Sequence, residues 1–423
     1  MDFSILLKPI NNCTCGQKHL CAIKDIVAKS GAINEVGEIL DKNNFGKNLL
    51  VVADKTTFNV ANGIQESLTK SGFNLTFKVY DFLRVATIQD VFDIENILTD
   101  NKLKIDGVLA IGTGSVHDTC RLATAKQNIP LCLFATAPSM DGFASYSAPI
   151  VNGNFKITYP AKCPEVIIAD TRILANAPLE LKCAGFGDML SKYVALIDWQ
   201  VSNLITGEPY CEKVASLTRS ATDKMMELKD KITKKDEETT LAIFEALIMT
   251  GIAMSWTKTS RPASGTEHIL AHYWECKELL QGKTPNYHGE DVGVATLLIL
   301  KKYNEFAKHK KISAHAEKVD WQDIYTTYGE LAQDVKKINT PDTITDGINP
   351  KKIEQNWDKI VKIINSVPTY EECLNAMKIA GCKTTITEIG KDKNFVAESL
   401  IYHPFMRKRL SLLRLKNMFD FVD

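Results

Sequence analysis

The feature that most constrains the fold is an alternation of short apolar runs with amphipathic helical patterns through the first 170 residues. Buried strands are predicted at 47–54, 75–80, 106–111 and 130–135, and helices at 57–70, 88–99 and 116–126. Strand–helix alternation of this kind is typical of a parallel sheet with covered faces. Ligands bind such sheets at the carboxyl ends of the strands, so the residues directly after each strand are the first candidates for a site.

A glycine-rich turn follows the strand predicted at 106–111 and leads into a helix. Its sequence is Gly112-Thr113-Gly114-Ser115-Val116-His117-Asp118, and its glycines let backbone N–H groups approach a pyrophosphate at the helix N-terminus. The third glycine of a G-x-G-x-x-G fingerprint is missing, and so is the Gly-Lys-Ser/Thr of a P-loop. A plain strand–helix turn therefore remains an alternative to a dinucleotide site.

Two other strand ends carry polar residues. Asp54 ends the strand at 47–54, where its carboxylate would either bind the ribose of a dinucleotide or cap the next helix. Its position before the glycine turn reverses the usual order, in which the acidic residue follows that turn by about 20 residues. The loop 136–145 is dense in hydroxyls and contains the carboxylate of Asp141. A polar turn would explain this loop, but its place on the same sheet edge favours a site.

From residue 171 onward helical periods dominate and the strand patterns stop. We therefore expect two domains. Residues 1–170 should form a nucleotide-binding α/β domain with a Rossmann-like, mostly parallel sheet, and residues 171–423 an all-α domain that binds metal and substrate. The active site is expected in the cleft between them.

The stretch 259–274 carries two histidines near the start of a predicted helix. Ser264 and Glu267 stand three residues apart, as an N-cap and its capping-box partner do. His268 and His272 are then one turn apart on one helix face. His268 falls in the first turn, where the helix dipole disfavours imidazolium and so favours the neutral form that binds a metal. Two histidines at this spacing are also common as ordinary half-buried side chains.

Two further segments supply the other ligands of a candidate metal site. Asp188 follows two glycines and is predicted to open a helix, where it would serve as a cap or as a ligand. His288 precedes the apolar helix predicted at 292–300. One carboxylate and two imidazoles make a three-ligand site with an open position, as in catalytic metal centres. This donor set suits zinc, nickel and iron(II) alike.

Charge and composition exclude several classes of function. Lys plus Arg and Asp plus Glu both number 51, so no global charge attracts nucleic acid or an anionic membrane. With no leader pattern at residues 1–8 and no run that approaches the ~18 apolar residues of a membrane span, we expect a soluble cytoplasmic protein. A basic group near the C-terminus is expected on the solvated face of a last helix; it comprises Arg407, Lys408, Arg409 and Arg414.

The cysteines number eleven, an odd count, and most are scattered singly, as free thiols in a reducing compartment are. One cluster differs, comprising Cys13, Cys15, His19 and Cys21. A structural zinc site is conceivable there, but Cys-x-Cys is not the usual spacing and no second cysteine pair lies nearby in the sequence. We favour a small β-hairpin at the start of the domain.

Taken together, these segments resemble the sn-glycerol-1-phosphate dehydrogenases, especially the bacterial type, within the wider group of dehydroquinate synthase-like and iron-containing alcohol dehydrogenases. The resemblance covers most of the chain, and its most specific pieces are 136–142 and 260–265. It implies that Asp188, His268 and His288 bind the metal, and that Asp54 contacts the adenosine ribose. It implies cofactor contacts at Gly112, Thr113, Gly114, Ser115, Val116, Asp118, Thr136, Ser139 and Ser145, and substrate contacts at Asp141, Asp188 and His272.

The implied activity is reversible hydride transfer between NAD(P)H and C2 of dihydroxyacetone phosphate, with NAD(H) or NADP(H) and one divalent metal. Asp54 favours NAD, because its charge would repel a 2′-phosphate. His272 and Asp141 are the expected catalytic residues, with His272 relaying a proton or holding a substrate hydroxyl. In iron-containing alcohol dehydrogenases the histidine that matches His272 ligates the metal instead.

For the substrate phosphate we consider Arg261, with Lys258 behind it, although Arg261 could equally well brace its own loop. A glycerol or other alcohol dehydrogenase, a dehydroquinate synthase-like lyase and a non-enzymatic nucleotide-binding module remain as alternatives. The expected partner is a small phosphorylated polyol. Neither nucleic acid nor membrane insertion is expected, and a homo-oligomer is left open.

Overall fold

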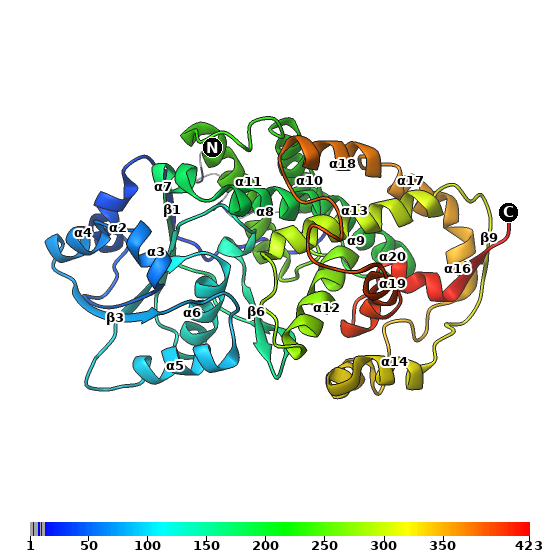
Figure 1. The fold of residues 1–423 in the computed structure, drawn as a ribbon, viewed down its shortest axis with the longest axis horizontal. Helices are drawn as coiled ribbons and strands as arrows, with labels where there is room; N and C mark the ends of the chain where they lie inside the picture. Colours follow the sequence, from blue (N-terminus) through cyan, green and yellow to red (C-terminus); the bar gives the residue numbers. More distant parts are fainter. Residues whose placement is uncertain (1–2, 4–6, 9, 11–12) are drawn as a thin grey trace.

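A six-stranded parallel sheet organises the N-terminal part of the protein in this computed structural model, which describes Phe3, Leu7, Lys8, Ile10 and residues 13–423. The expectation that residues 1–8 contain no leader therefore falls mostly outside the described residues. The strand order is β1-β8-β5-β4-β2-β3, and every neighbouring pair is parallel. The strands are β1 (Asp25–Lys29), β2 (Asn48–Asp54), β3 (Asn74–Tyr80), β4 (Gly107–Gly112), β5 (Leu131–Ala135) and β8 (Val166–Asp170). Figure 1 shows the sheet at one end of an elongated molecule.

Helices cover both faces of this sheet, which is why its inner strands are apolar at almost every position. Successive strand residues point to opposite faces, so Leu50 and Val51 belong to different hydrophobic clusters. One cluster joins the sheet to α2 (Val36–Lys42) and α4 (Ile64–Lys70). The other joins it to α5 (Ile88–Leu98) and α6 (Gly114–Gln127).

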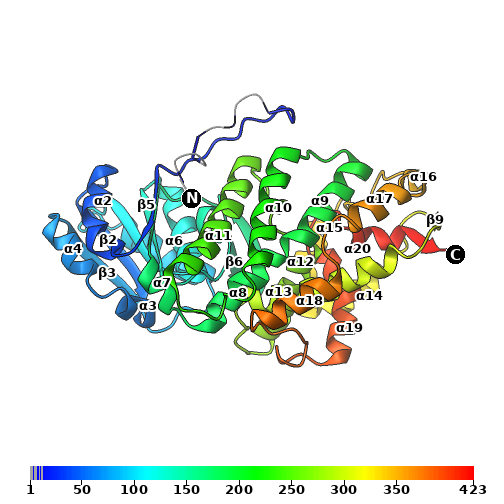
Figure 2. The same cartoon turned by 90° about the horizontal axis from the view of Figure 1, so that it is seen from above.

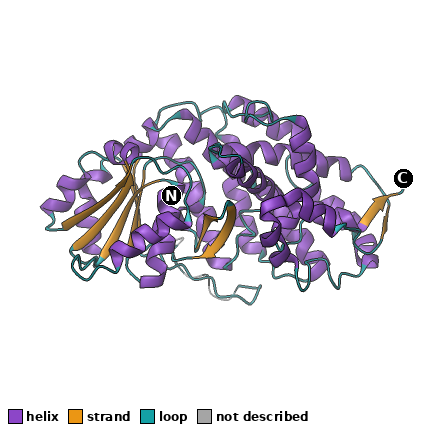
Figure 3. Ribbon diagram, turned by 60° about the horizontal axis from the view of Figure 1, so that its bottom comes forward, coloured by secondary structure: helices purple, strands orange, loops and turns teal. Residues whose placement is uncertain are grey.

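The four strands expected from the sequence are confirmed to within a residue or two. The single helix expected at 57–70 is wrong: α3 (Lys55–Val60) and α4 are separate, and Gly63 between them has a φ of 102°. The sequence pattern did not indicate β1, β8 or the antiparallel hairpin of β6 (Ser147–Asn152) and β7 (Phe155–Pro160). In Figure 3 this hairpin stands apart from the large sheet.

The part of the chain after residue 170 is rich in helices. They are α7 (Thr171–Asn176), α8 (Leu179–Leu190), α9 (Lys192–Thr206), α10 (Glu212–Glu227), α11 (Glu237–Thr257), α12 (Thr266–Leu280), α13 (His288–Phe306), α14 (Trp321–Tyr328), α15 (Ala332–Asn339), α16 (Pro350–Gln355), α17 (Trp357–Ile364), α18 (Tyr370–Ile379), α19 (Lys393–Tyr402) and α20 (Leu412–Leu415). Two short strands, β9 (Ile312–Ala314) and β10 (Phe419–Phe421), form an antiparallel pair. The expected all-α character is therefore corrected to helix-rich.

Short 3₁₀ turns connect several of these elements: η1 (Ala32–Glu35), η2 (Gly142–Ala144), η3 (Gly329–Leu331), η4 (His403–Met406) and η5 (Lys416–Met418). The largest hydrophobic cluster contains Ile26 and Ile167 of the sheet together with side chains of α8 through α20. This core is continuous across residue 170, where β8 gives way to α7, so a domain boundary there stays a prediction.

Helix α11 corrects one expectation from composition. Its 21 residues are long and apolar enough to cross a membrane, but 89% of the apolar window is buried inside the protein. Interior helices of large folded proteins are apolar on all sides for the same reason. We therefore assign α11 to the core of the helical half.

The strand order defines where a ligand should bind. Strand β2 lies between β3 and β4, so the chain passes from β2 to β3 on one side of β2 and then crosses to β4 on its other side. Ligands of open α/β sheets bind outside the carboxyl ends of the strands at such a switch point. The hydroxyl of Thr57, after β2, donates to the carbonyl oxygen of Ile111 in β4 at 3.0 Å, which ties the two strand ends together.

Candidate active site

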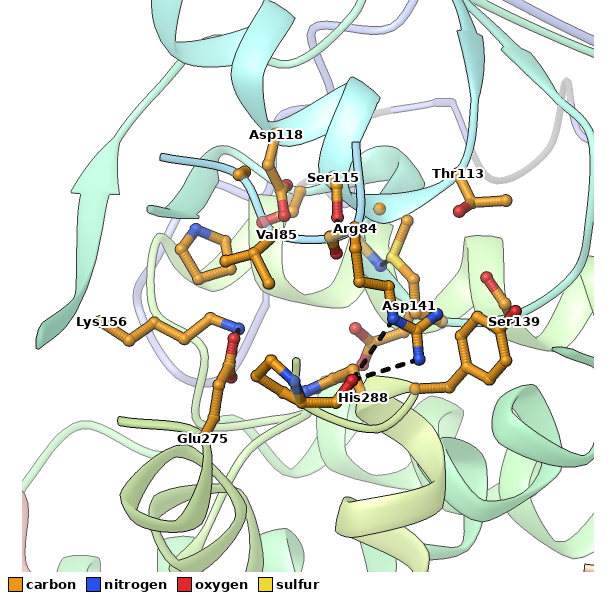
Figure 4. Close-up of a pocket in the computed structure, with 18 of the residues that line it drawn as sticks. Arg84, Val85, Thr113, Ser115, Asp118, Ser139, Asp141, Lys156, Glu275 and His288 are labelled. Carbon is orange, nitrogen blue, oxygen red and sulfur yellow. Dashed lines mark hydrogen bonds and ion pairs between the residues drawn. The ribbon is translucent and has the colours of Figure 1, made fainter. Parts of the chain in front are cut away.

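A cleft of about 370 Å³ lies where the carboxyl ends of the sheet strands face the first turns of α12 and α13. Figure 4 shows side chains from both halves of the chain pointing into it. Its lining includes Asp54, Thr113, Gly114, Ser115, Asp118, Thr136, Ser139, Asp141, Ser145, His268, His272 and His288. Most of the residues expected at the site are thus brought to one cavity.

The N-terminus of α6 forms the nucleotide side of the cleft. Thr113 is the N-cap, and its side chain makes no capping hydrogen bond. Thr113, Gly114 and Ser115 line the cleft, so the uncapped first N–H groups of this 14-residue helix are available there to bind an anionic phosphate. Ser115 donates to the carbonyl oxygen of Arg84 at 2.7 Å, which fixes the turn. Gly112 and Val116 lie behind this lining, with Val116 buried.

Asp54 does cap the next helix, as one alternative proposed. Its Oδ1 accepts from the backbone N–H and the hydroxyl of Thr57, at 2.8 and 3.0 Å. Because Asp54 also lines the cleft, capping does not exclude ribose binding, which stays a prediction. Asp118 lines the cleft as well and forms a buried ion pair with Arg121, whose guanidinium also donates to the carbonyl of Gly142.

Close packing of α8 against α13 positions two of the expected metal ligands. A Cβ on Gly187 would lie 2.5 Å from the carbonyl oxygen of Gly289, and a Cβ on Gly289 would collide with the carbonyl of Ala184. Only glycine permits this approach. As a result, Asp188 near the end of α8 lies beside His288, the first residue of α13. The sequence-based expectation that Asp188 opens a helix is wrong.

Asp188, His268 and His288 lie together, with one ligand atom of each within 4.8 Å of the others. The Nε2 of His268 is 3.4 Å from Oδ1 of Asp188. Two ligand atoms on a tetrahedral zinc ion lie about 3.4 Å apart, given metal–N and metal–O bonds of about 2.0–2.1 Å. The side chains therefore fit a divalent metal. His272, Glu275 and His288 form a second, overlapping group of possible ligands.

Two of the three imidazoles in the cleft are held in the neutral form that can bind a metal. Burial, together with the charge of Lys156, holds the pKa values of His272 and His288 well below the usual range, so both are neutral. His268 differs from the expectation of a lowered pKa. Burial opposes its charge, but the hydrogen bonds to Asp188 and Glu267 outweigh burial and raise its pKa.

Lys192 is a site residue that the sequence did not reveal. Its ammonium is completely buried, 2.6 Å from Oδ2 of Asp141 and 2.7 Å from Oδ1 of Asp188. Burial alone would raise the pKa of Asp188, but the charge of Lys192, together with the hydrogen bond and charge of His268, outweighs burial and lowers it. The i, i+4 spacing from Asp188 could have indicated this contact.

The start of α12 also differs from the expectation. Gly265, not Ser264, is the N-cap, and because glycine has no side chain the first helical N–H, that of Thr266, donates to Oδ2 of Asp198 at 2.7 Å. Glu267 instead turns back, so that its Oε1 accepts from the N–H of Gly265 at 2.8 Å and from Nδ1 of His268 at 2.7 Å. A carboxylate on Nδ1 fixes the tautomer of a metal-binding histidine and presents Nε2 to the metal.

At one end of the cleft, Lys156 of β7 forms an ion pair with Glu275 of α12 (Figure 4). The Nζ lies 2.8 and 2.6 Å from the two carboxylate oxygens. The pair is mostly buried and lies beside His272 and His288. Nothing in the local sequence around Lys156 distinguishes it, because the hairpin alone brings it into the site.

The expectation that Arg261 contacts the substrate phosphate is wrong. Its guanidinium is buried and donates to Glu208, to the carbonyl of Leu410 and to the hydroxyl of Ser202. Arg261 braces its loop and does not line the cleft. The expectation that the basic C-terminal group lies on a solvated helix face is also wrong. Arg407 and Arg409 donate to protein groups, including the carbonyls of Lys156 and Ser264, and Arg414 is fully buried.

Comparison with known proteins agrees with this geometry. Residues 27–178 match the family model described as iron-containing alcohol dehydrogenase. Over 406 residues the chain is 36% identical to the glycerol-1-phosphate dehydrogenase [NAD(P)+] of Halalkalibacterium halodurans, covering 95% of this chain and 94% of that protein. The chain belongs to the glycerol-1-phosphate dehydrogenase family. A relative of the same name from Pyrococcus furiosus is 32% identical, over 78% of this chain and 91% of its own length.

Solved structures confirm the fold. An NADH-dependent butanol dehydrogenase from Thermotoga maritima superposes with a TM-score of 0.61 at 14% identity, covering 93% of this chain and 96% of that one. A glycerol dehydrogenase from Schizosaccharomyces pombe has a TM-score of 0.58 at 17% identity, covering 85% and 92%. Membership of the dehydrogenase family confirms the expected class of activity: the protein is an NAD(P)-dependent oxidoreductase that acts on CH–OH groups and uses a divalent metal.

Proposed function

We propose that this protein interconverts dihydroxyacetone phosphate and sn-glycerol 1-phosphate. The observation that carries the proposal is one cleft that combines the N-terminus of α6 with the group Asp188, His268 and His288. The relatives from Halalkalibacterium halodurans and Pyrococcus furiosus are named as glycerol-1-phosphate dehydrogenases. When bound, the nicotinamide carries the hydride and the divalent cation polarises the C2 oxygen.

We propose that His272 transfers the proton of the substrate C2 hydroxyl. Its imidazole is buried and neutral at ordinary pH, and it lines the cleft one turn from His268 on α12. A neutral imidazole can accept the proton of the C2 hydroxyl during oxidation and return it during reduction. Asp141, held by Lys192 and by a 2.9 Å hydrogen bond from its own N–H to Asp188, is placed to orient the substrate hydroxyls.

We propose that Lys156, and not Arg261, binds the substrate phosphate. Among the described residues three cationic side chains line the cleft, and two of them have more than one partner. Arg121 donates to Asp118 and to the carbonyl of Gly142, and Arg84 lies 3.4 Å from the ring centre of Tyr287 and donates to the carbonyl of Pro285. Lys156 has one partner, Glu275, and lies at the histidine end of the cleft. A lysine ammonium is a common phosphate ligand.

We propose NAD(H) as the preferred cofactor, because the charge of Asp54 would repel a 2′-phosphate. Zinc, nickel or iron(II) would suit the Asp/His/His donor set. We also expect a cytoplasmic location without nucleic-acid or membrane partners.

A spectrophotometric assay at about 340 nm, the absorption of the reduced nicotinamide, tests the proposal. Metal-depleted enzyme is reloaded with zinc, nickel or iron(II), and its rates with dihydroxyacetone phosphate, dihydroxyacetone and glycerol are compared with NAD(H) and NADP(H). We expect dihydroxyacetone phosphate with NADH to give the highest kcat/KM, and His268→Ala to abolish both turnover and metal retention at this site. Preference for glycerol would favour a glycerol dehydrogenase, and full activity of a metal-free enzyme would refute the proposed site.

A further inference from the structure

The N-terminal segment doubles back on itself near the cysteine cluster. The N–H of Ile10 donates to the carbonyl of His19 at 3.2 Å, which is a single antiparallel bridge. A turn lies between them, in which the N–H of Gly16 donates to the carbonyl of Cys13 at 3.0 Å and Gly16 has a φ of 75°. The turn brings Cys13, Cys15 and His19 to one side of the segment. In the described part of this segment, the expected hairpin is thus one bridge and a turn.

A fourth residue joins this group from far along the chain. Cys211 immediately precedes α10 and is buried, and its Sγ lies 3.5 Å from Sγ of Cys13 and 3.4 Å from Nε2 of His19. The Sγ of Cys15 lies 3.3 Å from the same Nε2. All four ligand atoms are within 4.8 Å of one another. The sequence separation of 192 residues between His19 and Cys211 explains why the sequence alone offered no complete site.

We propose that Cys13, Cys15, His19 and Cys211 bind a structural zinc ion. Zinc–sulfur bonds of about 2.3 Å and zinc–nitrogen bonds of about 2.0 Å imply ligand separations of about 3.8 Å for S···S and 3.5 Å for S···N in a tetrahedron. The observed separations of 3.3–3.5 Å need only small adjustments. A disulfide would need its sulfurs about 2.05 Å apart, and the cysteines are free thiols.

The surroundings of His19 support this assignment. Its ring is almost completely buried, and Nδ1 lies 3.1 Å from the carbonyl oxygen of Trp256 at the end of α11. Donation from Nδ1–H to that carbonyl leaves Nε2 unprotonated and directed at the three sulfurs. This is the arrangement of most metal-binding histidines. Binding of zinc would displace the three thiol protons and leave the neutral imidazole in place.

Four protein ligands leave no open position, so the site would be structural rather than catalytic. It would fasten the N-terminal segment to the start of α10 and the end of α11, along which the segment lies in Figure 2. That segment leads directly into β1, an edge strand of the large sheet. Zinc would thus link the sheet to the helical half at a position separate from the cleft, and this inference does not depend on the proposed substrate.

Zinc K-edge X-ray absorption of the zinc-loaded full-length protein is the first test. We expect sulfur scattering at about 2.3 Å. Among the described residues, this is the one candidate metal group that contains cysteine, so a sulfur shell reports on it and not on the Asp/His/His group. A spectrum with nitrogen and oxygen scattering alone would overturn the proposal, whatever the fate of the catalytic assignment.

Variants provide the second test, with bound zinc measured by mass spectrometry after gel filtration. In a His268→Ala variant, which lacks the cleft metal site, we expect one bound zinc per chain. Adding Cys211→Ser to this variant should reduce the bound zinc to the level of a blank sample. The matched control is Cys21→Ser, because Cys21 lies in the same segment but outside the group of four ligands. Retention of zinc by the Cys211→Ser protein, or equal loss in the Cys21→Ser protein, would refute the site. Circular dichroism identifies any variant that has not folded, and the absorption spectrum of the wild-type protein then decides.

Discussion

The carboxylate of Glu267 should control how tightly the Asp/His/His group holds its metal. Glu267 is fully buried and accepts from Nδ1 of His268 at 2.7 Å, so Nε2 faces Asp188. Glu267→Gln keeps the size of the side chain and an oxygen that can accept the same hydrogen bond, but it removes the negative charge. The ring orientation should persist while the imidazole becomes a weaker ligand.

Removing a carboxylate that holds a ligand histidine costs about 10–100-fold in metal affinity. That range corresponds to about 1.4–2.7 kcal/mol. Because the glutamine oxygen still accepts from Nδ1–H and from the N–H of Gly265, we expect the lower half of this range.

Competition with a chromophoric chelator measures the dissociation constant of the metal in wild-type and variant proteins. Glu278→Gln is the matched control: it lies on the same helix, but its carboxylate is 2.8 Å from Lys391 and outside the metal group. We expect its metal affinity to match the wild type. An unchanged affinity in Glu267→Gln, or an equal loss in Glu278→Gln, would show that the hydrogen bond to His268 does not tune the metal.

Three further outcomes are expected. Arg261→Ala should leave the KM for dihydroxyacetone phosphate unchanged but lower the free energy of unfolding by about 2–3 kcal/mol, because the partly exposed Glu208 loses its buried partner. Denaturant titration measures the loss of stability, and a raised KM would show that Arg261 binds the phosphate after all. Lys156→Gln should raise the KM for dihydroxyacetone phosphate about tenfold or more without changing that for dihydroxyacetone, since a charge-assisted hydrogen bond contributes about 1.5–3 kcal/mol; equal changes for both substrates would contradict it. Burial lowers the pKa of His403 to about 3 in the folded protein, whereas in the unfolded chain its pKa is about 6.5. The unfolded state therefore binds the proton first, and the free energy of unfolding should fall by about 2 kcal/mol between pH 7 and pH 5. His403→Gln should remove that part of the slope in denaturant titrations, and an identical slope would refute it.

The sheet was largely predictable because its strands are buried on both faces and therefore read as continuous apolar runs. Strand β1 carries charged residues at both ends of its five-residue length, which hides the run. The hairpin β6–β7 had a usable signal, since Gly153-Asn154 separates two short strand-like segments. Gly63 likewise marks the break that the predicted helix at 57–70 overlooked.

Within the site, spacing along one helix was informative and contacts between segments were not. His268 and His272 share a face of α12 as their separation predicts, although the helix starts at Thr266 rather than after Ser264. The partner of Arg261 is Glu208, 53 residues earlier, and no local pattern connects them. The sequence indicated a cation near the ligand helix, but only the tertiary fold shows which acidic group neutralises it.

The two candidate metal groups have consequences for how the physiological metal can be identified. The cysteine-rich group is soft and closed, whereas the Asp/His/His group is harder and keeps an open position. Zinc bound by Cys13, Cys15, His19 and Cys211 would be present even in protein whose cleft is empty. Total zinc content therefore cannot identify the catalytic metal. Activity should follow the added nickel, iron or zinc in excess of one tightly held zinc per chain. Cys211→Ser should lower that baseline without changing which metal restores turnover.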